Sequence, residues 1–244
     1  MLGLGPGELA LAGVLVAVGS LVQGTIGFGF ALVTVPYLAL VAPEAVPASL
    51  LLLGVPLNVW VAARDLAHVH RDGVAEMGAG LLAGSAAGVV VLRVVDADAL
   101  TVAFGAAVLA GVIASALHPG ARFGRAARVA GGIASGVVNT VAATGGPMIA
   151  LLYQRRRGEE VRSTLAATFL IGIGFSIAGL AVAGRIGVSH VRVALALVPA
   201  MAAGVALSRA SARLLDRGWL RPAVLLFAAA SGVATILRGI LRAG

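Results

Sequence analysis

The stretch from Val18 to Leu38 reads VGSLVQGTIGFGFALVTVPYL, an apolar run interrupted by glycine, glutamine and threonine. Lipid cannot replace backbone hydrogen bonds, so non-helical backbone at membrane depth persists only inside protein or beside water. The run Gly24-Thr25-Ile26-Gly27-Phe28-Gly29 predicts such a break. A second stretch, from Gly131 to Gln154, reads GGIASGVVNTVAATGGPMIALLYQ. Its Gly145-Gly146-Pro147 predicts another, because proline favours the first turn of a new helix.

The composition around these stretches is that of a membrane protein. Of the 244 residues, 60% are hydrophobic and only 11% are charged, and the mean hydropathy is +1.04. A soluble domain carries about a quarter charged residues, so that class is excluded. The chain has no cysteine, which excludes disulfides and thiolate metal sites. We therefore predict an all-α polytopic membrane protein.

Charged residues divide the chain into eight apolar stretches: 9–42, 45–63, 74–92, 99–117, 129–154, 163–184, 193–208 and 220–237. The two long stretches stand at equivalent places, each followed by three ordinary spans. An offset of 116 residues pairs Gly29 with Gly145, Gln23 with Asn139 and Tyr37 with Tyr153. The order of elements predicts a duplication, with a first repeat over 1–118 and a second over 119–244.

The arginines favour one topology. All 18 basic residues are arginine, and the net charge is +8. If every stretch crosses once, the two sides hold nine arginines each, and no orientation follows. If each long stretch is a hairpin that enters and leaves on one side, the count is 13 against five, as the positive-inside rule requires. The hairpin topology makes the halves inverted repeats, a common arrangement in secondary transporters. Partial re-entry of the second, shorter stretch is the form we expect.

The breaks suit a small anion. A half-helix that begins at a break directs unpaired N–H groups and partial positive charge into the protein. Two such breaks from inverted halves are expected to meet near the midplane. No carboxylate or arginine lies in the middle of a predicted span, so dipoles and neutral donors would hold the anion. These donors are Gln23, Thr25, Asn139, Thr140 and Thr144. The alternative is that the glycines only allow close helix packing.

Other motifs have plainer interpretations. Gly80, Gly84 and Gly88 form overlapping GxxxG units, which predict close helix packing. Asn58 either faces the cavity or bonds a neighbouring helix. His68 and His70 lack a third ligand, so we expect loop polarity and no metal site. Gly174-Phe175-Ser176-Ile177-Ala178 is close to the GxSxG of serine hydrolases, but all four histidines lie outside the spans. An enzyme is therefore not expected.

The two motifs also resemble those of the sulfite exporter TauE/SafE family, also called the 4-toluene sulfonate uptake permease family. The first is G-x-x-G-F-G-x-x-L-x-x-V-P, from Gly24 to Pro36. The second runs from Ser135-Gly136 to Pro147, although Ala143-Thr144-Gly145-Gly146-Pro147 departs from the usual G-x-G-G-G-x-x-x-x-P. The resemblance implies a transporter of sulfite or organosulfonates in the cytoplasmic membrane. It implies a binding site formed by Gln23, Thr25, Gly27, Gly29, Asn139, Thr144, Gly145 and Gly146.

The function predicted from the sequence is a secondary transporter, an exporter by resemblance, that moves small sulfur-containing anions by alternating access. Two alternatives stay open: an anion channel with the same pore residues, and a membrane scaffold or assembly protein without transport. The expected partners are a small anionic substrate and the lipid bilayer. Neither a cofactor nor a nucleic acid is expected, and the oligomeric state does not follow from the sequence.

Overall fold

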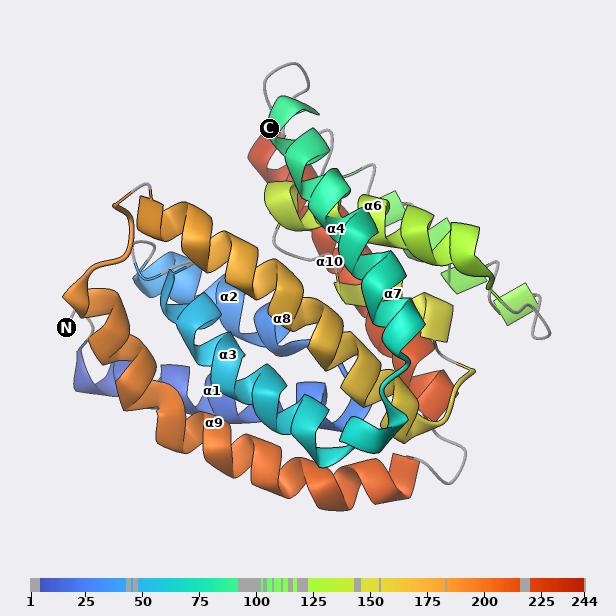
Figure 1. Cartoon of the computed structure of the whole chain (residues 1–244). Coiled ribbons are helices and arrows are strands. Elements are labelled where there is room, and N and C mark those ends of the chain that lie inside the picture. Colours follow the sequence, from blue (N-terminus) through green and yellow to red (C-terminus); the bar gives the residue numbers. More distant parts are fainter. Residues whose placement is uncertain are drawn as a thin grey trace.

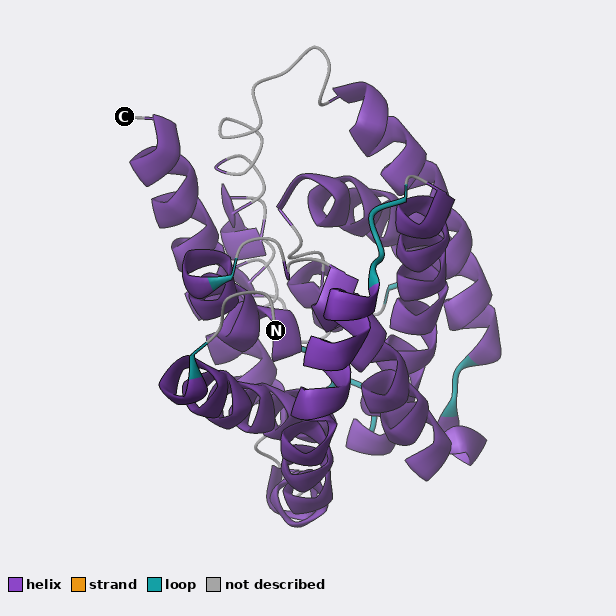
Figure 2. Ribbon diagram, turned by 90° about the vertical axis from the view of Figure 1, so that its left-hand side faces the viewer, coloured by secondary structure: helices purple, strands orange, loops and turns teal. Residues whose placement is uncertain are grey.

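A computed structural model describes residues 5–42, 45, 48–91, 123–142, 146–153, 155–182, 184–215 and 220–243, with a few isolated positions between 102 and 117. The described part is helical, without a strand, and its helices are joined by short loops (Figures 1 and 2). Three of the helices are long and apolar enough to cross a membrane: Pro6–Ile26, Gly158–Val182 and Val188–Arg213. The prediction of an all-α polytopic membrane protein is confirmed. The predicted span 99–117 lies largely outside the described residues.

The helices follow the predicted stretches closely. The first long stretch corresponds to α1 (Pro6–Ile26) and α2 (Phe30–Val41), and the second to α6 (Arg125–Ala142) and α7 (Gly146–Tyr153); α1 begins three residues and α6 four residues before the predicted starts. The other helices are α3 (Ala48–Arg64), α4 (Arg71–Val91), α8 (Gly158–Val182), α9 (Val188–Leu215) and α10 (Leu220–Ala243), with a short 3-10 helix η2 (Leu66–His68). Figure 1 shows α1, α2, α3, α8 and α9 together, with α4, α6, α7 and α10 beside them.

The first long stretch folds back on itself. Tyr37 on α2 donates its hydroxyl hydrogen to the carbonyl of Glu8 near the start of α1, at 3.3 Å. Farther along α1, Gly19 packs on α2, and a Cβ there would lie 3.1 Å from the carbonyl oxygen of Phe30. The start of α1 therefore meets the end of α2, and the two helices are antiparallel.

The second long stretch also begins and ends at one end of the helix bundle. Arg128 in the first turn of α6 forms an ion pair with Glu76 near the start of α4. The Tyr153 hydroxyl at the end of α7 lies 2.9 Å from Nδ1 of His70, just before α4. Both ends of this hairpin therefore lie beside the start of α4. Because α7 has only eight residues, it returns over about 12 Å, less than half the hydrocarbon thickness.

The first break separates two helices, since α1 ends at Ile26 and α2 begins at Phe30. In the second long stretch, α6 is described as far as Ala142 and α7 from Gly146, on either side of residues 143–145, which the structure does not describe. The hairpins also exchange partners, since α1 packs on α9 of the second half and α6 packs on α4 of the first.

Glycines bring the backbones of α4 and α6 together. A Cβ on Gly80 would lie 3.1 Å from Cα of Gly132, and one on Gly84 would lie 2.7 Å from the carbonyl carbon of Ile133. Gly136 faces the backbone of Leu81 and Ser85 in the same way. The predicted close packing is confirmed for Gly80 and Gly84, and the partner helix supplies its own glycines. Small residues allow this approach in membranes because helix association there depends on packing.

One end of the bundle collects arginines. We call it the arginine end: α3 finishes there, and α4, α6 and α8 begin there, with Arg64, Arg71, Arg125, Arg128, Arg155, Arg156, Arg157 and Arg162. The loop between α8 and α9 lies at the opposite end and holds Arg185. Arg93 and Arg122 lie outside the described residues. The described arginines thus follow the hairpin topology expected from the charge count.

Candidate functional site

The first break is built by two glycines and a glutamine. Gly27 and Gly29 have φ values of 100° and 116°, which side chains with a Cβ rarely adopt. The side-chain amide of Gln23 bonds to the residue that follows them: its Oε1 accepts a hydrogen bond from the Phe30 N–H at 3.1 Å. Its Nε2 donates to Oδ1 of Asn58 on α3 at 2.8 Å. Gln23 therefore satisfies the first amide of α2, which Gly29 has no side chain to cap.

Of the two alternatives for Asn58, the structure shows the bond to a neighbouring helix. The side chain is 2% exposed, and its Nδ2 donates to the carbonyl of Gly54 at 2.8 Å. Asn58 thus joins α3 to α1 through Gln23. Thr25, another predicted donor, gives its hydroxyl hydrogen to the carbonyl of Leu21 at 2.6 Å. In this conformation both predicted donors of the first half bond to the protein itself.

Replacing Gln23 with leucine is expected to destabilise the protein. The substitution leaves the Phe30 N–H and Oδ1 of Asn58 without their partner in a buried place, at about 1–3 kcal/mol for each group. Thermal unfolding in detergent should show a clear fall in melting temperature. Asn139→Leu is the matched control, because Asn139 is exposed on α6 and should change stability little. Equal melting temperatures for the two variants would contradict this account of Gln23.

The start of α7 lies against the first break. Gly146 begins α7, and a Cβ added to it would lie 3.4 Å from Cβ of Phe28 and 3.4 Å from the ring of Phe169. Phe28, between the two left-handed glycines, is 1% exposed. Its ring meets that of Phe227 on α10 edge to face, with centroids 5.6 Å apart. The meeting point of the hairpins is therefore closed by aromatic side chains.

The other predicted residues of the second half have different outcomes. Asn139 lies on α6 and is exposed, whereas its sequence counterpart Gln23 is buried. Thr144 and Gly145 lie outside the described residues, and so does the side chain of Thr140. Of the predicted second-half residues that the structure describes, only Gly146 contacts the first break. We call the place where Gly146 meets Phe28 the junction.

Charged residues beside the first break were missed by the sequence interpretation. Arg162 falls just before the predicted span 163–184, but it lies one turn inside α8 and its side chain is 3% exposed. Its Nε lies 3.6 Å from Oδ2 of Asp65, which also pairs with Nε of Arg64 at 3.2 Å. Arg64 donates further to the Gly24 carbonyl at 2.9 Å and to the Ser208 hydroxyl at 3.2 Å. Charged side chains therefore lie beside the break, in addition to the dipoles and neutral donors that were expected to hold an anion.

Backbone packing places Arg162 at the break. Cα of Arg162 lies 3.3 Å from the position that a Cβ of Gly27 would occupy, and Cδ1 of Leu165 lies 3.0 Å from it. The first turns of α8 thus run directly against Gly27. A glycine is required here for space as well as for its backbone angle.

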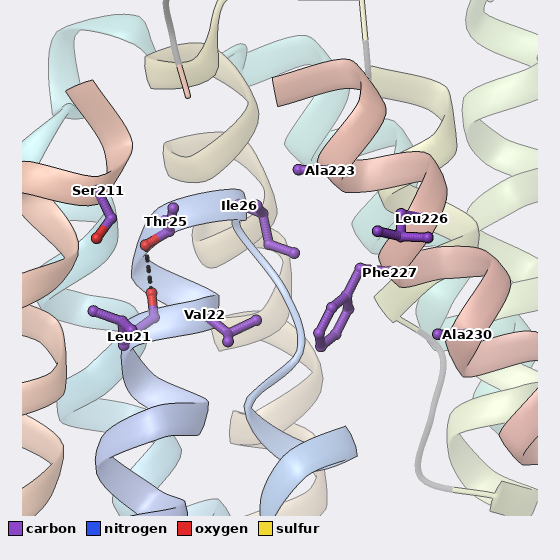
Figure 3. Close-up of a pocket in the computed structure, with 9 residues that line it drawn as sticks. All are labelled: Leu21, Val22, Thr25, Ile26, Ser211, Ala223, Leu226, Phe227 and Ala230. Atoms are coloured by element: carbon purple, nitrogen blue, oxygen red, sulfur yellow. Dashed lines mark hydrogen bonds between the residues drawn. The ribbon is translucent and has the colours of Figure 1, made fainter. Parts of the chain in front are cut away.

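An apolar cavity lies on the side of the break that faces α9 and α10. It has a volume of about 440 Å³ and is lined by Leu21, Val22, Thr25, Ile26, Ser211, Ala223, Leu226, Phe227 and Ala230. Figure 3 shows Phe227 reaching from α10 toward α1, and the Thr25 hydroxyl turned to Leu21. The lining carries no charge, so this cavity lacks the chemistry to attract an anion.

The histidines take part in local interactions at the arginine end. Nδ1 of His70 accepts a hydrogen bond from the Gly73 N–H at 3.0 Å and lies beside the Tyr153 hydroxyl. His68 lies 3.6 Å from Glu159. Within the described part of the chain, no three histidine, cysteine, aspartate or glutamate side chains cluster as a metal site would need.

Comparison with known proteins identifies a family. The family model described as sulfite exporter TauE/SafE matches residues 10–235, which include both predicted breaks and all of α2, α7 and α8. No curated protein and no solved structure matches the chain.

Proposed function

The chain belongs to the sulfite exporter TauE/SafE family, and we propose that it exports small sulfur-containing anions, such as sulfite or organosulfonates, across the cytoplasmic membrane. Family membership supports an integral membrane transporter of such anions. The substrate, the direction and the membrane are parts of the proposal. The arginine end faces the cytoplasm in this proposal, because positively charged loops are retained there.

The packing of Gly146 against Phe28 is the observation that carries the proposal. It brings the start of α7, from the second half, against the turn between α1 and α2 in the first half. Interrupted helices that meet inside a bundle are where secondary transporters bind substrate. We assign the anion site to this junction, formed by Gln23, Thr25, Gly27, Gly29, Asn139, Thr140, Thr144, Gly145 and Gly146.

Alternating access is the mechanism proposed for this junction. The sequence offset of 116 residues and the exchanged pairing of α1 with α9 and α6 with α4 support two inverted repeats. Movement of one hairpin against the other would expose the junction to one side and then to the other. Phe28 and Phe227 close it in the conformation described here.

Ligand binding tests this function directly. The purified protein should be stabilised against heat by at least one of sulfite, sulfate, thiosulfate, sulfoacetate and lactate, with sulfur oxyanions the most effective. A ligand that binds only the folded state adds about 2.7 kcal/mol at 100 times its dissociation constant. Such a gain is readily measured as a shift in melting temperature.

Measurement of anion flux into proteoliposomes then distinguishes a carrier from a channel and from a scaffold. A carrier gives uptake of the stabilising anion that saturates with concentration. A flux far above carrier rates and without saturation would show a channel instead. No stabilisation and no flux for any of the five anions would reject transport and favour a scaffold.

A further inference from the structure

The start of α4 is capped by a histidine ring. His70 directly precedes α4, and its carbonyl accepts the first helical hydrogen bond, from the Val74 N–H at 2.9 Å. Its ring nitrogen Nδ1 accepts a hydrogen bond from the Gly73 N–H at 3.0 Å. Serine, threonine, aspartate and asparagine usually occupy this position, because their side-chain oxygens accept such a bond. A histidine ring can accept here only while Nδ1 carries no proton.

The same ring nitrogen holds the end of the second hairpin. The Tyr153 hydroxyl lies 2.9 Å from Nδ1 of His70, and the two rings meet edge to face with centroids 5.9 Å apart. Tyr153 lies in the last described turn of α7 and is 2% exposed. Because the Gly73 N–H can only donate, Nδ1 is an acceptor, and the Tyr153 hydroxyl donates to it as well. A Cβ on Gly73 would collide with both groups, so the glycine allows their approach.

The backbone of His70 is fixed by α8. Its N–H donates to Oγ1 of Thr164 at 3.0 Å, and Thr164 is fully buried. The histidine itself is half-buried, so water at the arginine end can reach its ring. His70 therefore stands where α4, α7 and α8 meet, and its ring is the part that a proton from solvent can change.

Charges of both signs lie around this ring. Glu76 on α4 bonds to Arg128 on α6, and Arg156 after α7 pairs with Glu160 on α8 at 3.1 Å. Among the residue types present, only histidine ordinarily changes charge between pH 5 and 8. The response of the ring to protonation therefore follows mainly from the direct contacts of Nδ1. The titratable and charged groups on the elements packed around it are Arg71, Asp72 and Glu76 of α4, Arg125 and Arg128 of α6, Tyr153 of α7, Arg156 and Arg157 after it, Glu159, Glu160 and Arg162 of α8, and His68 of η2.

Protonation of Nδ1 removes the acceptor at this point. The proton comes from water at the arginine end and takes the lone pair that the Gly73 N–H and the Tyr153 hydroxyl share. Two N–H groups then face each other, at a helix N-terminus whose partial positive charge opposes a cationic ring. The ring must turn away from α4, and Tyr153 loses its link to that helix.

We propose that His70 is a proton-operated latch: the neutral ring holds the end of α7 against α4, and protonation releases it. Helix α7 has only eight residues, and Gly146 at its start packs on Phe28 at the junction. Release of Tyr153 therefore frees the short arm of the second hairpin that reaches the junction. The latch goes beyond the proposed function, and only its effect on transport rests on that function.

The test measures how fast a buried thiol on α7 reacts with a methanethiosulfonate reagent at pH 8 and at pH 6. The chain has no cysteine, so Ala150→Cys supplies a single thiol at a residue that is 0% exposed. Gly124→Cys, at an exposed residue before α6, corrects for the pH dependence of the thiol reaction itself. The ratio of the two rates should rise about fivefold from pH 8 to pH 6, the factor expected from the loss of one helix cap.

Two asparagine variants separate His70 from its neighbour. His70→Asn keeps an acceptor for the Gly73 N–H but does not titrate, so the ratio should stay at its pH 8 value. His68→Asn is the matched control, because that ring lies two residues away beside Glu159, and the rise should persist. The latch is overturned by a constant ratio in the wild-type background, by an equal rise in His70→Asn, or by loss of the rise in His68→Asn.

Tyr153→Phe tests the link to the hairpin. It keeps a ring against His70 but removes the hydroxyl, so the ratio at pH 8 should approach the wild-type value at pH 6. A wild-type ratio at pH 8 would show that the hydroxyl does not hold α7, and would overturn the latch. Rates are measured on the monodisperse peak from size-exclusion chromatography, so that unfolded protein does not contribute. Absence of anion binding and flux would instead reject the proposed function and leave the labelling result standing.

Discussion

A Gly84→Ala protein is expected to unfold far below the wild-type temperature. The new Cβ would lie 2.7 Å from the carbonyl carbon and 2.8 Å from Cα of Ile133 on α6. These are backbone atoms, so no change of rotamer relieves the overlap, and α4 must move away from α6. Inserting a methyl group into a tight interface typically costs 1–3 kcal/mol, and we expect about 3 kcal/mol or more here. The higher helix propensity of alanine offsets only about 1 kcal/mol of this destabilisation.

Gly174→Ala provides the control for this result. Gly174 lies on α8 with no atom within 4 Å of an added Cβ, so the same change there should leave stability unchanged or raise it slightly. Differential scanning fluorimetry in one detergent compares the two variants. If Gly84→Ala melts within a degree of Gly174→Ala, the close packing of α4 on α6 is not what stabilises this half of the protein.

The sequence predicted this interface, because glycines spaced four apart identify a helix face without any knowledge of the fold. The breaks followed from local chemistry in the same way: glycine at Gly27 and Gly29 permits left-handed backbone, and a helix ends at Ile26 and restarts at Phe30. Charge asymmetry predicted the hairpins. The glycine inferences depend on residues close together in the chain, and the hairpin inference depends only on a count of arginines, so none of them requires a contact between distant residues.

The buried arginine could not be found in that way. Arg162 follows the run Arg155-Arg156-Arg157 and two glutamates, so composition placed the span after it. In the structure α8 begins at Gly158, and its second turn is buried because Asp65 and Gly27 come from distant parts of the chain. Likewise, Gln23 aligns with Asn139 by offset, but its partner Asn58 lies on another helix. Long-range pairing decides which polar residues are inside.

Gly29→Val is expected to abolish anion transport while the protein still inserts into the membrane. The residue has φ of 116°, a conformation in which a β-branched side chain is strongly strained. A Cβ there would also lie 2.6 Å from Cε1 of Phe227 and 2.9 Å from Cγ1 of Val22. Phe227 packs edge to face on Phe28, so the valine would displace the ring that closes the junction. In the proposed site it would further keep the anion away from the backbone N–H groups.

Gly184→Val separates backbone strain from damage to the junction. Gly184 also has positive φ, at 65°, but it lies in the loop after α8 with no atom within 4 Å of an added Cβ. The Gly184→Val substitution therefore destabilises the protein by about 1–2 kcal/mol through left-handed backbone strain, but it does not change the contacts of the hairpins. Flux of the stabilising anion into proteoliposomes should persist in Gly184→Val and vanish in Gly29→Val at equal protein incorporation. Wild-type flux in Gly29→Val would remove the first break from the transport path, because neither the strain nor the displaced aromatic ring would then matter to the moving anion.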